Sequence, residues 1–124
     1  MSDYTPGQLR RIDMLVAVHV EGLRVDASEW HNLSDAVRDA GGNLATVPHY
    51  TTDGAHAWRV LEWLVEGEAD IEICKSMDGS GGYRSLDTTD WYHQRWGEAK
   101  TLPLAICLHA LAVAGADVEK EVTR

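Results

Sequence analysis

The chain has 124 residues, 44% of them hydrophobic and 25% charged, which is the composition of one globular domain over residues 1–124 and excludes a disordered protein. Twenty acidic residues against eleven basic ones give a net charge of −9, which repels phosphate backbones and argues against general nucleic-acid binding. Two cysteines without a CxxC motif, no secretory leader and no apolar run long enough for a bilayer predict a cytoplasmic protein without a membrane segment.

The first predicted element is a helix. Thr5 resembles an N-cap and Pro6 fits the first turn, and apolar residues then recur at helical spacing until Gly22 signals the end. The segment that follows has a weaker pattern. Apolar residues between Trp30 and Ala40 fall at helical spacing, which predicts a short helix there.

The middle of the chain predicts one helix followed by an antiparallel meander. Thr52 or Asp53 can cap the helix, and Gly67 is placed to end it. Apolar and polar residues then alternate, and a glycine-rich connection at 78–82 joins two of the alternating runs. The predicted strands are residues 71–74, 83–88 and 91–98.

The last predicted element is a buried helix. Thr101 is a candidate cap with Pro103 in the first turn, and the following residues up to Gly115 are apolar almost all round, as expected of a helix packed on a sheet. Residues 117–124 have the composition of a charged, frayed tail. The fold class is therefore α+β, with an antiparallel sheet of three or more strands packed against helices.

Two stretches carry a resemblance to a known family. Val47-Pro-His-Tyr-Thr-Thr-Asp53, which leads into Ala57-Trp58, and Ala99-Lys-Thr-Leu-Pro-Leu-Ala-Ile-Cys-Leu-His-Ala-Leu111 together resemble the phage ABA (α-β-α) sandwich domain. The departures are Thr51 where Ser is frequent, Gly54 in the first helical turn and His109 in a usually Ala-rich stretch. The resemblance implies a bacteriophage or prophage protein whose small sheet is packed between helices. It implies no single activity, although small phage proteins are frequently accessory factors that bind host components.

Searches for catalytic and metal-binding patterns give no site. The pair His19-x-Glu21 matches half of the zinc deaminase signature, but the second half is missing because Cys107 has no partner thiol nearby. Cys107 also lies inside the predicted buried helix, where its reactivity would be suppressed. Asp87, Asp90 and His93 are close together but straddle a turn, so they are interpreted as polar turn residues. The sequence therefore predicts a non-enzymatic protein with no catalytic residue, no metal and no cofactor.

Residues suited to ligand binding are easier to identify than catalytic residues. In the third predicted strand, alternation places Trp91, His93 and Arg95 on one face, where aromatic rings can stack on a nucleobase and Arg can hold a phosphate. Core packing is the alternative for the Trp residues. Helix N-termini at Thr52 and Thr101 can supply anion-binding amides. The candidate ligand-binding residues are Tyr50, Thr51, Arg59, Tyr83, Arg84, Trp91, His93, Arg95 and Thr101.

Three functions are compatible with these features. The first is a phage binding module, as a homo-oligomer in the host bacterial cytoplasm, that captures a small nucleotide-like defence signal. The second, motivated by the charge of −9, is an acidic inhibitor or adaptor that docks on a basic surface of a host defence protein. The third is an oligomeric accessory component without a soluble ligand.

Overall fold

A computed structural model of the chain describes residues 4–24, 36–38, 41–42, 44–67, 71–75, 81–87 and 96–122. The helices among them are α1 (Pro6–His19), α3 (Gly54–Glu66), α4 (Leu102–Ala114) and α5 (Val118–Val122). The strands are β1 (Ala36–Arg38), β2 (Leu44–Thr46), β3 (Ile71–Lys75), β4 (Tyr83–Asp87) and β5 (Trp96–Ala99). These elements confirm the predicted α+β class.

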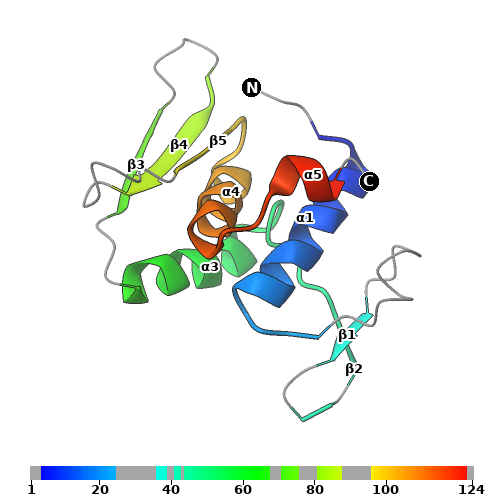
Figure 1. The fold of residues 1–124 in the computed structure, drawn as a ribbon. Helices are drawn as coiled ribbons and strands as arrows, with labels where there is room; N and C mark the ends of the chain where they lie inside the picture. The colour runs from blue at the N-terminus through cyan, green and yellow to red at the C-terminus, as the bar shows by residue number, and fades with distance from the viewer. Residues whose placement is uncertain are drawn as a thin grey trace.

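The strands form two separate antiparallel sheets. One has the order β3-β4-β5, and in it Tyr83 of β4 is paired with Lys75 of β3 and with Ala99 of β5. This is the predicted meander. The third strand was expected from residue 91 onward, and residues 91–95 lie outside the described part of the chain. The second sheet is the β1-β2 pair, which lies beyond α1 and away from the larger sheet (Figure 1).

Helix α4 is the centre of the molecule. It lies between the three-stranded sheet and α1, and it also packs against α3 (Figure 1). A Cβ atom at Gly97 of β5 would lie 2.2 Å from the Ala105 carbonyl oxygen and 2.4 Å from the His109 amide nitrogen, so α4 approaches β5 more closely than any other residue would permit. The residues of α4 that are buried point in nearly all directions: Leu104, Ala105, Ile106, Cys107, His109, Ala110 and Leu111.

Local signals set the ends of the three long helices. In α1, the Thr5 hydroxyl accepts from the Gln8 amide and the Gln8 side chain accepts from the Thr5 amide, which completes a capping box. In α3, the Asp53 carboxylate accepts from the Ala55 amide at 2.9 Å. Gly115 ends α4 with φ of 82°, a left-handed conformation that favours glycine. The predicted starts of these helices and the ends of α3 and α4 are confirmed, whereas α1 ends at His19, before Gly22.

One stripe of helix α3 is turned to the core. Its buried residues are Ala57, Val60 and Leu64, and Leu61 is only partly buried. This stripe packs against α4.

Two expectations are wrong. The predicted helix between residues 30 and 40 is contradicted at 36–38, which form β1, because pairing with β2 satisfies the backbone there; residues 30–35 and 39–40 lie outside the described ranges. The expected frayed tail instead contains α5. Val122 is buried at its end, and the Tyr4 hydroxyl donates to Glu119 at 3.3 Å, so α5 is tied to the start of the chain. No helix in the described ranges is long and apolar enough to span a bilayer.

Candidate functional site

A pocket with apolar walls and several hydroxyl groups lies where the N-terminal ends of α1 and α4 meet the loop that precedes α3. Its volume is about 510 Å³. Two of the predicted ligand-binding residues, Thr51 and Thr101, lie in its wall, although they are distant in the sequence. The described residues that line it are Tyr4, Leu9, Thr51, Thr52, Lys100, Thr101, Pro103 and Leu104. We call this the α4 pocket.

The loop that carries Thr51 is held against α1 by a buried carboxylate. The Thr51 amide donates to Asp13 Oδ1 at 2.8 Å, and Arg10 Nη1 donates to Asp13 Oδ2 at 2.7 Å. Arg10 also donates to the carbonyl oxygen of Val47 at 3.0 Å, and its Nη1 lies 3.0 Å from His49 Nδ1. One side of the pocket is therefore fixed by hydrogen bonds to α1.

Asp13 has an unusual environment for a carboxylate, because only 1% of its surface is exposed. Burial raises the pKa of Asp13 above its ordinary value, and the hydrogen bond from the Thr51 amide and the charge of Arg10 counteract this only in part. The Thr51 hydroxyl is buried and has no hydrogen-bond partner among the described residues. Asp13 acts as a buried anchor for the loop.

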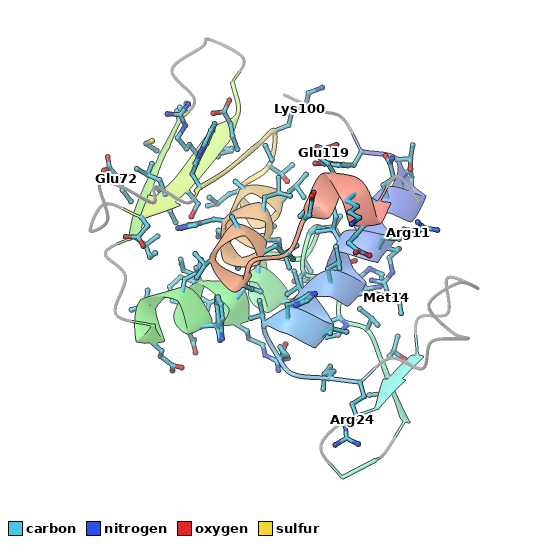
Figure 2. All side chains as sticks on the ribbon, viewed as in Figure 1. Arg11, Met14, Arg24, Glu72, Lys100 and Glu119 are labelled. Carbon is cyan, nitrogen blue, oxygen red and sulfur yellow. The ribbon has the colours of Figure 1, made fainter. Side chains whose placement is uncertain are left out.

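The opposite wall of the pocket is the start of α4. Thr101 is the N-cap, but its side chain makes no capping hydrogen bond, so it does not cover the amide groups of the first turn. Lys100 precedes it, and in Figure 2 its side chain extends outward from the turn between β5 and α4. The positive end of the helix and the ammonium group thus lie at the same edge of the pocket. Lys100 was not among the residues predicted from the sequence, although a cation beside a helix N-cap can indicate an anion-binding site.

Tyr50 and Arg59 lie apart from the α4 pocket. Tyr50 is fully buried, and its hydroxyl donates to Glu21. Arg59 Nη2 donates to the other oxygen of Glu21 at 2.6 Å. Burial, followed by the hydrogen bond to Glu21, raises the pKa of Tyr50 strongly. Both predicted residues thus serve to satisfy one carboxylate at the end of α1.

Arg84 and Tyr83 lie on the three-stranded sheet. Arg84 donates through Nε and Nη2 to Glu98 Oε2 at 3.0 and 2.8 Å, and its guanidinium carbon lies 4.8 Å from the ring centre of Trp96. Trp96 is half exposed, so this stacked group faces solvent. Tyr83 is partly buried against the core. The other three predicted residues, Trp91, His93 and Arg95, lie outside the described part of the chain.

A serine and a histidine meet inside the molecule between β4 and α4. Ser85 Oγ lies 2.8 Å from His109 Nδ1, and Asp87 is buried on the same face of β4. Ser85 and His109 have no exposed surface, so a substrate has no access to this pair. Cys107 is also fully buried, and burial raises the pKa of its thiol. Among the described residues, no group of three or more His, Cys, Asp or Glu side chains is placed to hold a metal ion.

Comparisons with known proteins agree with this architecture. The model of the phage ABA sandwich domain family matches residues 14–111, which include the C-terminal part of α1, the loop that carries Thr51, the three-stranded sheet and most of α4. A crystal structure of a phage protein from Bacillus cereus ATCC 14579 is similar, with a TM-score of 0.69, 25% identity and 94% of each chain covered. A search of curated proteins found no match. The family match covers well over half of the sequence, and the chain belongs to the phage ABA sandwich domain family.

Proposed function

We propose that this phage protein is a binding module whose α4 pocket captures a small, phosphorylated, nucleotide-like ligand of the host without transforming it. One observation carries the proposal. The pocket combines apolar walls with hydroxyl groups, a lysine and the positive end of a long helix, and none of the described residues that line it is acidic.

The size and walls of the pocket suit a ligand of this kind. Its volume of about 510 Å³ falls in the usual range for small-molecule sites. Leu9 and Pro103 offer apolar contact for a flat ring, and Tyr4 adds an aromatic surface. Thr52 and Thr101 are exposed and can donate hydrogen bonds to sugar or phosphate oxygens.

The local charge distinguishes this pocket from the rest of the surface. The chain carries a net charge of −9, which disfavours anions over most of the molecule. At the α4 pocket, Lys100 and the first turn of α4 provide the opposite sign. The hollow beside Arg59, in contrast, is lined by Glu21, Glu62 and Glu66 and is unsuited to a phosphate. An anionic ligand would therefore be directed to the α4 pocket.

Capture without reaction is the simplest role for such a site in a small phage protein. The described wall holds hydroxyl groups, the Lys100 ammonium group and the Tyr4 phenol, and its residues include no serine, histidine and aspartate in the pattern of a hydrolase. A phage protein that binds a host signal lowers its free concentration by mass action alone. We therefore place the function in sequestration of a host defence signal.

The test is ligand-induced stabilisation. Thermal unfolding is measured with a nucleoside monophosphate, a cyclic dinucleotide, the matching unphosphorylated nucleosides and inorganic phosphate. We expect a rise in Tm with a phosphorylated nucleoside that exceeds the rise with either part alone, because binding to the folded state stabilises it. Lys100→Gln should abolish most of the rise, and Lys75→Gln, which removes an exposed lysine from β3, is the matched control.

Two results would contradict the proposal. The first is the lack of any shift with the tested nucleotides at saturating concentration, or an equal shift in the Lys100→Gln protein. The second concerns capture without reaction. The ligand released by heating the complex should have its original mass and chromatographic behaviour, and a converted product would show that the site is catalytic.

A further inference from the structure

A second surface lies on the side of α3 that faces away from α4. Trp58 and Val65 are exposed to 61% and 56%, which is unusual for large apolar side chains. Together with neighbouring residues of α3 they line a hollow of about 380 Å³. We call this the α3 surface, and the residues that form it are Trp58, Leu61, Glu62, Val65 and Glu66.

The fold itself does not require apolar residues at these positions. Helix α3 already buries Ala57, Val60 and Leu64, and its packing partner on that side is α4. Trp58 and Val65 contribute to a different stripe, since positions separated by three, four or seven residues lie on one face of a helix. Exposed apolar side chains that gather in one patch, beside a hollow, are typical of a protein interaction site.

The charges beside the apolar stripe are negative. Glu62 and Glu66 are one helical turn apart, and they line both the α3 surface and a neighbouring hollow of about 230 Å³ that also includes Glu21. Arg59, the nearby cation, is bound to Glu21 at 2.6 Å. Within the described ranges, neither Glu62 nor Glu66 forms a salt bridge, so two carboxylates that repel each other border the exposed Trp58.

We propose that the α3 surface binds a basic amphipathic helix of a partner protein. Apolar side chains of that helix pack into the hollow beside Trp58 and Val65, and its lysine or arginine side chains pair with Glu62 and Glu66. A tryptophan that a partner covers on binding is the kind of residue that contributes most to such an interface. The surface shares no residue with the α4 pocket, so this proposal does not depend on the one above.

A second copy of the chain fits this surface less well. Pairing of two α3 helices would bring Glu62 and Glu66 near the same residues of the other copy, and both copies carry a charge of −9. Like charges at an interface disfavour association. We therefore choose a basic partner, whose charge is complementary to that of Glu62 and Glu66.

The test uses a designed probe. A synthetic amphipathic helix of about 18 residues, roughly five turns, with Leu on one face and Lys on the other, is titrated into the full chain, and affinity is measured by fluorescence anisotropy of the labelled peptide. A peptide of the same pattern with Glu in place of Lys is the charge control. We expect binding of the basic peptide only, with affinity that falls as salt is raised.

Matched variants locate the site. Trp58→Ala should weaken binding at least about tenfold, whereas Trp96→Ala, which removes a tryptophan of similar exposure from β5, should leave it unchanged. Glu66→Gln should weaken binding about twofold to fivefold and should not make the affinity more dependent on salt. Glu72→Gln on β3 is the control with the same charge change (Figure 2). Circular dichroism confirms that each variant is folded.

Three outcomes would overturn the proposal. One is equal binding of the basic and acidic peptides, or no binding of the basic peptide. Another is equal weakening by Trp58→Ala and Trp96→Ala. The third is a dimer in light scattering that Trp58→Ala converts to a monomer, because this would show that a second copy occupies the surface.

Discussion

The carboxylate of Asp13 in α1 accepts a hydrogen bond from the backbone amide of Thr51 at 2.8 Å, and both residues are buried. This bond joins the first helix to the loop that forms one wall of the α4 pocket. Arg10 completes the arrangement by binding the second carboxylate oxygen and the Val47 carbonyl. The loop therefore depends on α1 for its position, and the pocket depends on the loop.

Asp13→Ala should destabilise the protein by about 3 kcal/mol, because it leaves the Thr51 amide without its acceptor and the partly buried Arg10 without its counter-charge. Urea unfolding followed by circular dichroism measures this loss. Glu72→Ala removes an exposed carboxylate on β3 and should change the free energy of unfolding by less than about 0.5 kcal/mol. Equal effects of the two substitutions would contradict the assigned role of Asp13.

The pH dependence of stability should reveal the raised pKa of Asp13. A carboxyl group whose pKa is higher in the folded than in the unfolded state, where it is about 3.9, favours folding below that value and loses this contribution as the pH rises through the folded pKa. The difference in unfolding free energy between the native protein and Asp13→Asn should therefore be larger near pH 4 than at pH 7. A difference that is smaller near pH 4 would show that the pKa is depressed.

Gly97→Ala should be among the most damaging single substitutions in the sheet. The added Cβ would meet the backbone of α4 at 2.2 Å from the Ala105 oxygen, so the helix or the strand would have to move. We expect a loss of about 3 kcal/mol or more in urea unfolding. Gly54→Ala is the control, because nothing lies within 4 Å of its Cβ position at the start of α3, and it should gain between about 0.4 and 1 kcal/mol.

Tyr50→Phe should alter the response to alkaline pH. Burial and the hydrogen bond to Glu21 raise the pKa of Tyr50, so in the native protein stability is lost above about pH 10, where the unfolded tyrosine ionises and the folded one does not. At pH 7 the variant should be less stable by about 1 kcal/mol, the contribution of the lost hydrogen bond. That deficit should shrink as the pH rises past 10. A constant deficit across this range would contradict the assignment.

The sequence predicts best those elements whose signals are local. Thr5 with Pro6, Asp53 and Gly115 each act on the backbone within one helical turn, and the helix ends that they mark lie where expected. The short elements were missed because neighbours distant in sequence stabilise them. β1 is paired with β2, and α5 is anchored by Val122 and by the contact of Glu119 with Tyr4.

In the candidate site, too, residues marked by local sequence signals were predicted, and roles that depend on distant contacts were not. Thr51 and Thr101 were singled out because each is near a helix start, and the structure brings them to one pocket. The role of Asp13 was not predictable, since a carboxylate in the middle of an apolar helical stripe gives no indication of which distant amide it will bind. Arg59 was predicted to bind a ligand, but it forms a salt bridge with Glu21, which is distant in the sequence.

The central position of α4 also has a dynamic consequence. Its backbone amides are screened on all sides by β4, β5, α1 and α3, so solvent deuterium can reach them only when those neighbours separate. The slowest-exchanging amides of the molecule should thus belong to the middle of α4, and their rates should report opening of the entire domain. α3, which has one side in water, can open by smaller fluctuations.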